Sequence, residues 1–227
     1  MAESDVAKVI RLEHAILEKN AQFATWNRGY FRGRDIVAVN FLSSPGAGKT
    51  ALLERLARDH ATELRLAVIE ADLATDRDAE RIRAAGAPVI QVNTGAVCHL
   101  DAHMLGHALE SLDPKTGSLL AIENVGNLVC PAMFDLGERA RVVVFSVTEG
   151  EDKPIKYPHM FARADVVILN KMDLAPHVDF DEAAARGFLE KVAPRARILA
   201  ASARTGMGVA ELAAYLGSLR EEPKRAS

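Results

Sequence analysis

The chain has few cysteines and no excess of positive charge. Only two of its 227 residues are cysteines, and the formal net charge is −3. Two cysteines are too few for a disulfide-stapled scaffold, although they are enough for a metal site. A protein that binds nucleic acid without sequence preference is usually basic. The composition therefore argues against a disulfide-rich domain and against nucleic acid as a partner.

The chain also lacks a long hydrophobic run. No apolar stretch approaches the length needed to cross a bilayer, so we expect no membrane span. The first residues, Met-Ala-Glu-Ser-Asp, are acidic and polar, unlike a signal peptide. We therefore place the protein in the cytoplasm, where a structural disulfide is not expected.

What the sequence does contain is an alternation of short apolar runs and helical patterns. Hydrophobic residues make up 49% of the chain, enough for a substantial core. Strands are expected at 36–42, 64–69, 88–92, 119–122, 142–147, 166–169 and 197–200, and helices between them include 51–57, 76–85, 99–109, 180–192 and 209–219. This alternation predicts an α/β fold with a mostly parallel sheet covered by helices on both faces.

A long amphipathic helix is expected before the first strand, over residues 5–31. We divide the chain into an N-terminal helical extension (1–34), one α/β domain (35–220) and a polar, frayed tail (221–227).

A phosphate-binding loop follows the first apolar strand. The segment Ser-Ser-Pro-Gly-Ala-Gly-Lys-Thr matches the P-loop pattern except at Ser43, where the pattern has glycine. Glycines let backbone N–H groups curl around phosphate oxygens, and the following helix turns its positive end to the anion. Lys49 is expected to reach the β- and γ-phosphates, and the Thr50 hydroxyl to hold Mg²⁺. The nucleotide-contacting residues expected here are Ser44, Gly46, Ala47, Gly48, Lys49, Thr50 and Ala51.

A guanine-reading motif follows the apolar run at 166–169. Asn170-Lys171-Met172-Asp173 is similar to the N-K-x-D element of GTPases, in which the Asp accepts two hydrogen bonds from guanine and the Lys packs on the base. Adenine does not offer those two donors, so such a site rejects it strongly. Ser202-Ala203-Arg204 resembles the loop that supports the base in those proteins.

Two carboxylates are candidates for the Mg²⁺ site and for catalysis. Glu123-Asn-Val-Gly resembles a D-x-x-G switch with Glu in place of Asp. Asp72 is the second candidate, either through water to Mg²⁺ or by orienting the attacking water, and a helix cap or a solvated carboxylate is the alternative. We expect Lys49, Asp72 and Glu123 to act in catalysis, and Thr50, Asp72 and Glu123 to hold Mg²⁺.

Both cysteines follow strands at the edge where parallel α/β sheets bind ligands. Cys98 precedes His99, and Cys130 lies seven residues after Glu123. Thiolate and imidazole suit Zn²⁺ and Ni²⁺, and three ligands leave the shell incomplete. Two buried thiols acting as small hydrophobes are the alternative. His99, His103 and His107 are spaced to share a helix face, and His103 is a further candidate ligand.

These segments together resemble one family. The runs at 93–103, 123–131 and 146–154 are similar to signatures of the nickel-insertion GTPases of NiFe-hydrogenase maturation, the HypB family. Asn27-Arg28, the Asp72 segment and the P-loop match as well, so the resemblance spans about residues 15–218. The Cys-His pair with Asn-Leu-Val-Cys-Pro is the specific part of the match.

The resemblance implies a P-loop metallochaperone that hydrolyses GTP slowly to GDP and couples turnover to nickel delivery into the hydrogenase large-subunit precursor. It implies that Cys98, His99 and Cys130 bind nickel or zinc near the interface of a GTP-dependent homodimer. A HypA-type nickel chaperone is the implied partner. Some members carry an N-terminal cysteine motif or a histidine-rich stretch, whereas here no cysteine precedes Cys98, which argues against tight nickel storage.

Rival interpretations remain at this stage. The urease accessory GTPase uses a Cys-Pro-His triplet, and here no proline separates Cys98 from His99. A nucleotide-dependent adaptor with a structural zinc is a second alternative, and a small-substrate P-loop kinase is disfavoured by Asp173. Lys153 is either a solvated lysine or a residue that reaches a partner protomer.

Overall fold

A seven-stranded parallel sheet forms the centre of the computed structural model, which describes residues 5–72, 77–95 and 97–220, with side chains from residue 14 onward. The strand order is β3-β2-β4-β1-β5-β6-β7, and every neighbouring pair is parallel. The strands are β1 (Val37–Ser43), β2 (Leu66–Asp72), β3 (Val89–Asn93), β4 (Leu119–Glu123), β5 (Ala140–Ser146), β6 (Val166–Asn170) and β7 (Arg197–Ala200). The predicted α/β class is confirmed.

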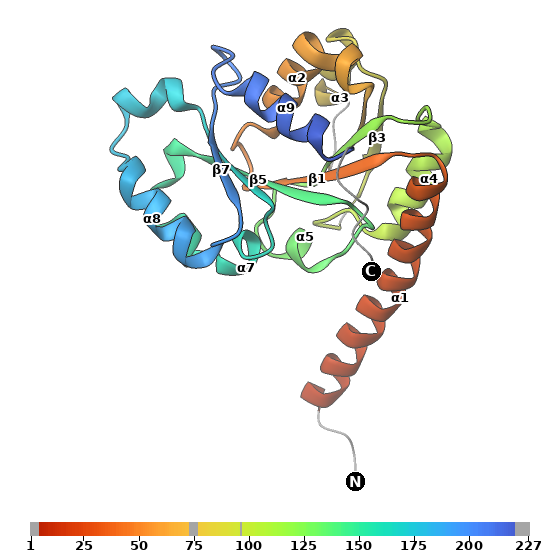
Figure 1. Cartoon of the computed structure of the whole chain (residues 1–227). Helices are drawn as coiled ribbons and strands as arrows, with labels where there is room; N and C mark the ends of the chain where they lie inside the picture. Colours follow the sequence, from red (N-terminus) through yellow and green to blue (C-terminus); the bar gives the residue numbers. More distant parts are fainter. Residues whose placement is uncertain (1–4, 73–76, 96, 221–227) are drawn as a thin grey trace.

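Helices cover both faces of this sheet (Figure 1). One face packs against α2 (Lys49–Leu64), α3 (Arg77–Ala84) and α9 (Val209–Ser218). The other face packs against α1 (Asp5–Gly33), α4 (Ala102–Leu112), α5 (Cys130–Met133), α7 (Pro158–Phe161) and α8 (Glu182–Val192). Three short elements, η1 (Val147–Glu149), α6 (Lys153–Lys156) and η2 (Met172–His177), lie in connections that follow β5 and β6.

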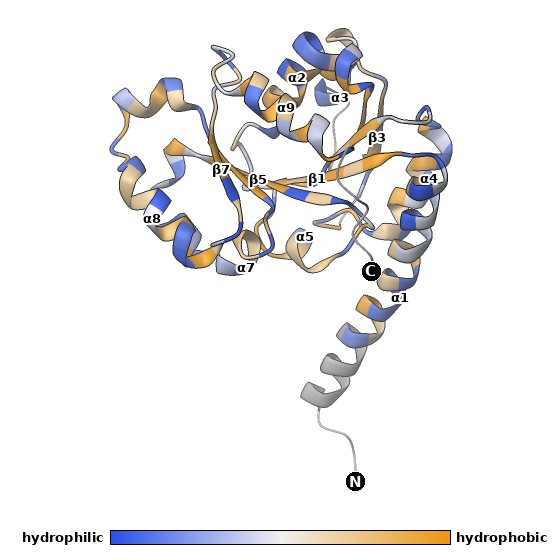
Figure 2. Ribbon diagram, in the orientation of Figure 1, coloured by the Kyte–Doolittle hydropathy of each residue, from blue (hydrophilic) through white to orange (hydrophobic). Residues whose placement is uncertain are grey.

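The central strands are apolar because they are buried on both faces. Every residue of β4 and β6 is buried, as expected for parallel strands between two helical layers. The hydropathy colouring shows this apolar centre and the more polar outer surfaces of the helices (Figure 2). Polar residues buried in the sheet, such as Glu70 and Glu123, are therefore exceptions that need a reason.

The N-terminal helix α1 is present as expected, and its second half packs on α4. Ala24 and Phe31 are buried in the same core cluster as α4. The amide of Asn27 donates to the carbonyl oxygen of Ala102 at 2.8 Å, and the side-chain oxygen of Asn20 accepts from the Ala102 N–H at 2.9 Å. Helix α1 thus holds the start of α4, while its first half extends beyond the body of the molecule (Figure 1).

Several predicted boundaries are shifted in the structure, and two of these shifts bear on the site. The strand expected at 64–69 runs from Leu66 to Asp72, because α2 continues to Leu64 and Arg65 turns the chain in the left-handed conformation. The helix expected at 99–109 begins at Ala102, because the Asp101 carboxylate caps it by accepting from the Met104 N–H at 2.8 Å.

His99 consequently lies before α4 and does not share a helical face with the two later histidines. The predicted start of a helix at Asp76 and the predicted tail at 221–227 lie outside the described residues. Among the helices of the described ranges, none contains an apolar stretch that could span a lipid bilayer.

Candidate functional site

The predicted phosphate loop joins β1 to α2 at the carboxyl edge of the sheet. Gly46 and Gly48 have positive φ angles of 72° and 99°. A Cβ on Gly48 would also lie 2.7 Å from the Asn170 amide nitrogen, so this position has no room for a side chain. The Lys49 ammonium is buried and donates to the Ser43 hydroxyl at 2.8 Å. Burial lowers the pKa of Lys49, and the nearby Glu123 opposes that shift.

The guanine motif touches this loop directly. The Asn170 amide donates to the Ala47 carbonyl oxygen at 2.9 Å, and the Lys171 ammonium donates to that of Gly46 at 2.7 Å. Lys171 has a positive φ of 61°, at the turn where β6 ends. These contacts span 123 and 125 residues of sequence, so the structure joins the two motifs into one site.

The Asp173 carboxylate is held in place by the loop after β7. The Ser202 hydroxyl donates to its Oδ1 at 2.6 Å, and Arg204 lies 3.7 Å from its Oδ2. The Asp173 side chain is 15% exposed and that of Arg204 is 81% exposed. The exposed Arg204 pair is screened by water and holds the carboxylate weakly, whereas the Ser202 hydrogen bond fixes it. The remaining predicted contacts, Ala51 and Ala203, lie on the first turn of α2 and between Ser202 and Arg204.

Two carboxylates meet the Thr50 hydroxyl. Its oxygen lies 2.8 Å from Glu123 and 3.0 Å from Asp78. Glu123 ends β4, and its pKa is raised to about 7, mainly by burial. Asp72 ends β2, and its charge contributes to that shift. Predicted residues Thr50, Asp72 and Glu123 are therefore gathered at one place, and Asp78 joins them.

A further carboxylate, Glu70, lies beside this group. It pairs in register with Glu123 on the neighbouring strand. Its side chain is buried, and burial together with Glu123 raises the pKa of Glu70 to about 8. Among the described residues, Oε2 of Glu70 and Oε2 of Glu123 have no hydrogen-bond partner. Crowded carboxylates with free oxygens next to a hydroxyl fit a hard divalent cation such as Mg²⁺.

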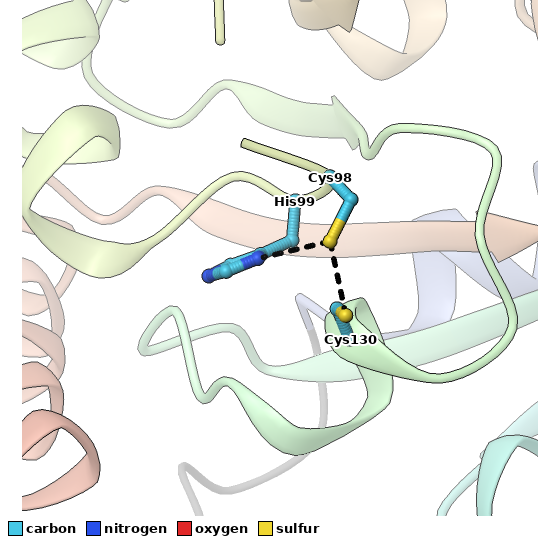
Figure 3. A group of neighbouring side chains, drawn as sticks. All are labelled: Cys98, His99 and Cys130. Atoms are coloured by element: carbon cyan, nitrogen blue, oxygen red, sulfur yellow. Dashed lines mark hydrogen bonds between the residues drawn. The ribbon is translucent and has the colours of Figure 1, made fainter. Parts of the chain in front are cut away.

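The two cysteines and the neighbouring histidine form a cluster (Figure 3). The Sγ atoms of Cys98 and Cys130 are 3.0 Å apart, and the Cys98 sulfur is 3.9 Å from the His99 Nδ1. The three ligand atoms all lie within 4.8 Å of one another. A metal about 2.3 Å from each sulfur needs the sulfurs about 3.3–3.8 Å apart, so a shift of less than about 1 Å would accommodate an ion. All three side chains are half-buried.

The surroundings of this cluster orient its members. The His99 ring stacks on Phe134 with centroids 3.8 Å apart. Burial lowers the pKa of His99, which favours the neutral imidazole that metals bind. The hydrogen bond with Cys98 raises the pKa of the Cys130 thiol.

A short segment connects the carboxylate group to the cysteine cluster. The Asn124 side-chain oxygen accepts from the backbone N–H groups of Leu100 and Val125, each at 3.0 Å. A Cβ on Gly126 would lie 2.9 Å from the Cα of Pro45 in the phosphate loop. One stretch of chain therefore touches both the phosphate loop and the residue next to His99.

Lys153 is not a solvated lysine. Its ammonium pairs with Glu149 at 3.0 Å, and its side chain is 18% exposed. Glu149 also accepts from the Ser44 hydroxyl of the phosphate loop and from the Ser146 N–H. The segment after β5 is thus tied to the phosphate loop by a carboxylate.

Four residues of this site were missed by the sequence analysis. Glu70 is a charged residue within an otherwise apolar strand, which is a visible signal, and Asn124 stands next to a residue that was singled out. Asp78 and Glu149 carry no local signal, because their partners lie 28 and 105 residues away.

Comparison with known proteins places the chain in a family. The model of the "CobW/HypB/UreG, nucleotide-binding domain" family matches residues 37–200. The hydrogenase maturation factor HypB of Rhizobium leguminosarum bv. viciae is 56% identical over 209 residues, which cover 92% of this chain and 70% of the relative.

Solved structures agree. HypB from Helicobacter pylori, crystallised in complex with nickel, is 36% identical and has a TM-score of 0.87. The match covers 92% of this chain and 98% of the chain in that structure. HypB from Archaeoglobus fulgidus is 39% identical and has a TM-score of 0.84, and the match covers 90% of this chain and 100% of the chain in that structure. This chain belongs to the HypB family of hydrogenase maturation factors.

Proposed function

We propose that this protein is a GTP-hydrolysing metallochaperone that couples GTP binding and hydrolysis to nickel delivery into the NiFe-hydrogenase large-subunit precursor. The observation that carries the proposal is the link through Asn124. Its neighbour Glu123 touches Thr50 at the phosphate loop, and its own side chain holds Leu100, next to His99. A change at the nucleotide therefore has a short physical route to the metal ligands.

Guanine selection rests on Asp173. With Ser202 fixing one oxygen, the carboxylate faces the base position with acceptors only. Guanine supplies two donors to such a group and adenine does not. Lys171 and Asn170 hold the phosphate loop against this side of the pocket.

Phosphate binding and hydrolysis rest on the loop, its lysine and the carboxylates. Lys49 and the N-terminus of α2 bind the β- and γ-phosphates. Thr50, Glu123 and Asp78 would hold Mg²⁺, directly or through water, and Mg²⁺ would neutralise charge that develops on the phosphates. Asp72 orients the water that attacks the γ-phosphorus. Hydrolysis consumes one water and yields GDP and phosphate, and loss of the γ-phosphate would remove the anion whose charge the Mg²⁺ held by Thr50 and Glu123 would neutralise.

Nickel is the cargo of Cys98, His99 and Cys130. Three soft or borderline ligands suit Ni²⁺ and Zn²⁺. A position left open, filled by water or by a second copy of the chain, allows the ion to be passed on. We propose a GTP-dependent homodimer as the form in which this happens, with a HypA-type nickel chaperone and the hydrogenase precursor as partners, in the cytoplasm. Residues 35–220 form the GTPase unit, with 1–34 as a helical extension and 221–227 as a tail.

Two measurements test this proposal. Cys98→Ala should remove one equivalent of bound Ni²⁺ relative to wild type, and unchanged stoichiometry would show that the metal site is elsewhere. Purified protein should turn over GTP and leave ATP intact, and equal turnover of ATP would overturn the role of Asp173. Tight zinc that resists chelators and ignores nucleotide would favour a structural-zinc adaptor instead.

A further inference from the structure

A cavity of about 420 Å³ lies at the edge of the sheet opposite the phosphate loop. Its walls include residues 139–141, 162–165 and 193–196, which lead into β5, β6 and β7. Because neighbouring strands are all parallel, the starts of these strands share the amino edge of the sheet, whereas the phosphate loop follows the carboxyl end of β1. No residue that the structure places at the nucleotide site or in the cysteine cluster lines this cavity.

The cavity carries positive charge, although the chain as a whole does not. Five arginines and three acidic residues line it, whereas the chain has a formal net charge of −3. Two of these arginines have acidic partners, because Arg28 lies 2.5 Å from Asp135 and Arg141 lies 2.6 Å from Glu138. The excess charge therefore resides in the other arginines of the wall.

Two of those arginines are available to a ligand. Arg163 precedes β6 and Arg195 precedes β7, and both side chains are exposed. In the part of the chain that the structure describes, neither guanidinium has a hydrogen-bond or ion-pair partner, although Asp165 lines the same cavity. Strands β6 and β7 are paired neighbours, so the loops that precede them bring the two guanidinium groups to one cavity.

One wall of the cavity is held in place before any ligand arrives. The Arg141 side chain is only 12% exposed, and it donates to the Glu138 carboxylate at 2.6 Å. It also donates to the carbonyl oxygens of Ala132 at 3.1 Å and Phe134 at 3.3 Å. A wall fixed by this many contacts costs little ordering when a ligand binds.

The rest of the lining favours carboxylate side chains on a peptide. Guanidinium groups bind carboxylates through two parallel hydrogen bonds. The small apolar residues of the wall, which leave room for the methylene groups of Asp and Glu, are Ala140, Ala162, Ala164, Ala193, Pro194 and Ala196. The volume lies within the range of about 300–1,000 Å³ for ligand pockets, and it exceeds what a single oxyanion fills. A ligand with several carboxylates therefore fits better than one phosphate.

We propose that this cavity binds an acidic segment of a partner protein, whose Asp or Glu side chains pair with Arg163 and Arg195. A partner held at the amino edge of the sheet leaves the nucleotide site and the cysteine cluster uncovered at the opposite edge. The proposal goes beyond the proposed function, since the interaction needs neither nucleotide nor metal.

The test is the binding of a peptide of alternating glutamate and glycine, labelled with a zwitterionic rhodamine, to the full chain by fluorescence anisotropy. Wild type should bind this peptide, more weakly as salt is added, and should not bind the matched glutamine–glycine peptide. The double variant Arg163→Gln with Arg195→Gln should weaken binding by about tenfold or more, because two charge-assisted contacts are lost. GDP binding should stay unchanged in this variant, which shows that it is folded and keeps this test independent of the nucleotide site.

A charge-matched control and a competitor complete the design. Arg58→Gln with Arg83→Gln removes the same charge from exposed positions on α2 and α3, and it should change peptide affinity less than about twofold, because distant charges are screened. Inorganic phosphate should not displace the peptide. Equal loss in both double variants would show that net charge alone attracts the peptide, and displacement by phosphate would show a site for a single anion. Either result, or no peptide binding by wild type, would overturn the proposal.

Discussion

The Asn124 side-chain oxygen accepts a hydrogen bond from the backbone N–H of Leu100 at 3.0 Å. This contact bridges 24 residues and is buried. It joins the end of β4, where Glu123 meets the phosphate loop, to the segment that carries Cys98 and His99. In the proposed function, this hydrogen bond is the contact through which the nucleotide site affects the metal ligands.

Removal of this connection should uncouple the two sites. Asn124→Ala leaves the Leu100 N–H without its acceptor, which should lower the free energy of unfolding by about 1–3 kcal/mol. Metal affinity should then no longer differ between the GDP-bound and GTP-analogue-bound forms, as measured by titration with a metal indicator. Asn93→Ala is the control, because among the described residues the Asn93 side chain accepts only from the Gly95 N–H of its own turn. Coupling that persists in Asn124→Ala would show that another route carries it.

Asp173→Asn should reverse the polarity of base recognition. The amide presents a donor where guanine also presents one, so GTP affinity should fall by about 10³-fold or more. Nucleotide binding measured with a fluorescent GDP analogue checks this. Asp179→Asn, at an exposed position after η2, should have no effect. Wild-type affinity in Asp173→Asn would contradict the assignment of the guanine pocket.

Asp78 tests the proposed Mg²⁺ position. Asp78→Asn keeps the shape of the side chain but removes one charge next to Thr50. The Mg²⁺ concentration that half-saturates GTP-analogue binding should rise about tenfold. Asp59→Asn removes a carboxylate from the outer part of α2, where Asp59 pairs with Arg55, and serves as control. An unchanged Mg²⁺ requirement would exclude Asp78 from the site.

In the protein without nucleotide or Mg²⁺, the buried Glu70 should make the free energy of unfolding depend on pH. Its pKa is raised from 4.5 to about 8, mainly by burial. Between these values the folded state retains a proton that the unfolded chain has released, so stability falls as pH rises from about 4.5 to about 8. The loss is on the order of 5 kcal/mol. Denaturant titrations across this range measure it.

Glu70→Gln should reduce that dependence, because the amide is neutral at every pH, and should leave the smaller part that comes from Glu123, whose pKa is raised to about 7. Glu80→Gln, on the exposed side of α3, should leave it unchanged. If the free energy of unfolding of Glu70→Gln depends on pH as in wild type, another group causes the dependence.

The fold was predictable because strands buried on both faces are apolar throughout, as in β4 and β6. The phosphate loop and Asp173 were predictable because local spacing encodes them. The start of α4 was missed because the Asp101 cap competes with a helical pattern that begins earlier. Asp78 was missed because only the folded chain brings it to Thr50. Contacts between residues that are far apart in the chain cannot be read from a single sequence.

The most direct test of nucleotide-controlled metal binding is one titration of Ni²⁺ and of Zn²⁺ into wild type and Cys98→Ala. Each is titrated with GDP and with a non-hydrolysable GTP analogue, while metal stoichiometry and oligomer size are followed together. We predict that wild type changes both metal affinity and oligomer size between the two nucleotides, and that Cys98→Ala loses the nucleotide-sensitive metal. Identical metal binding and identical size with both nucleotides would contradict the coupling.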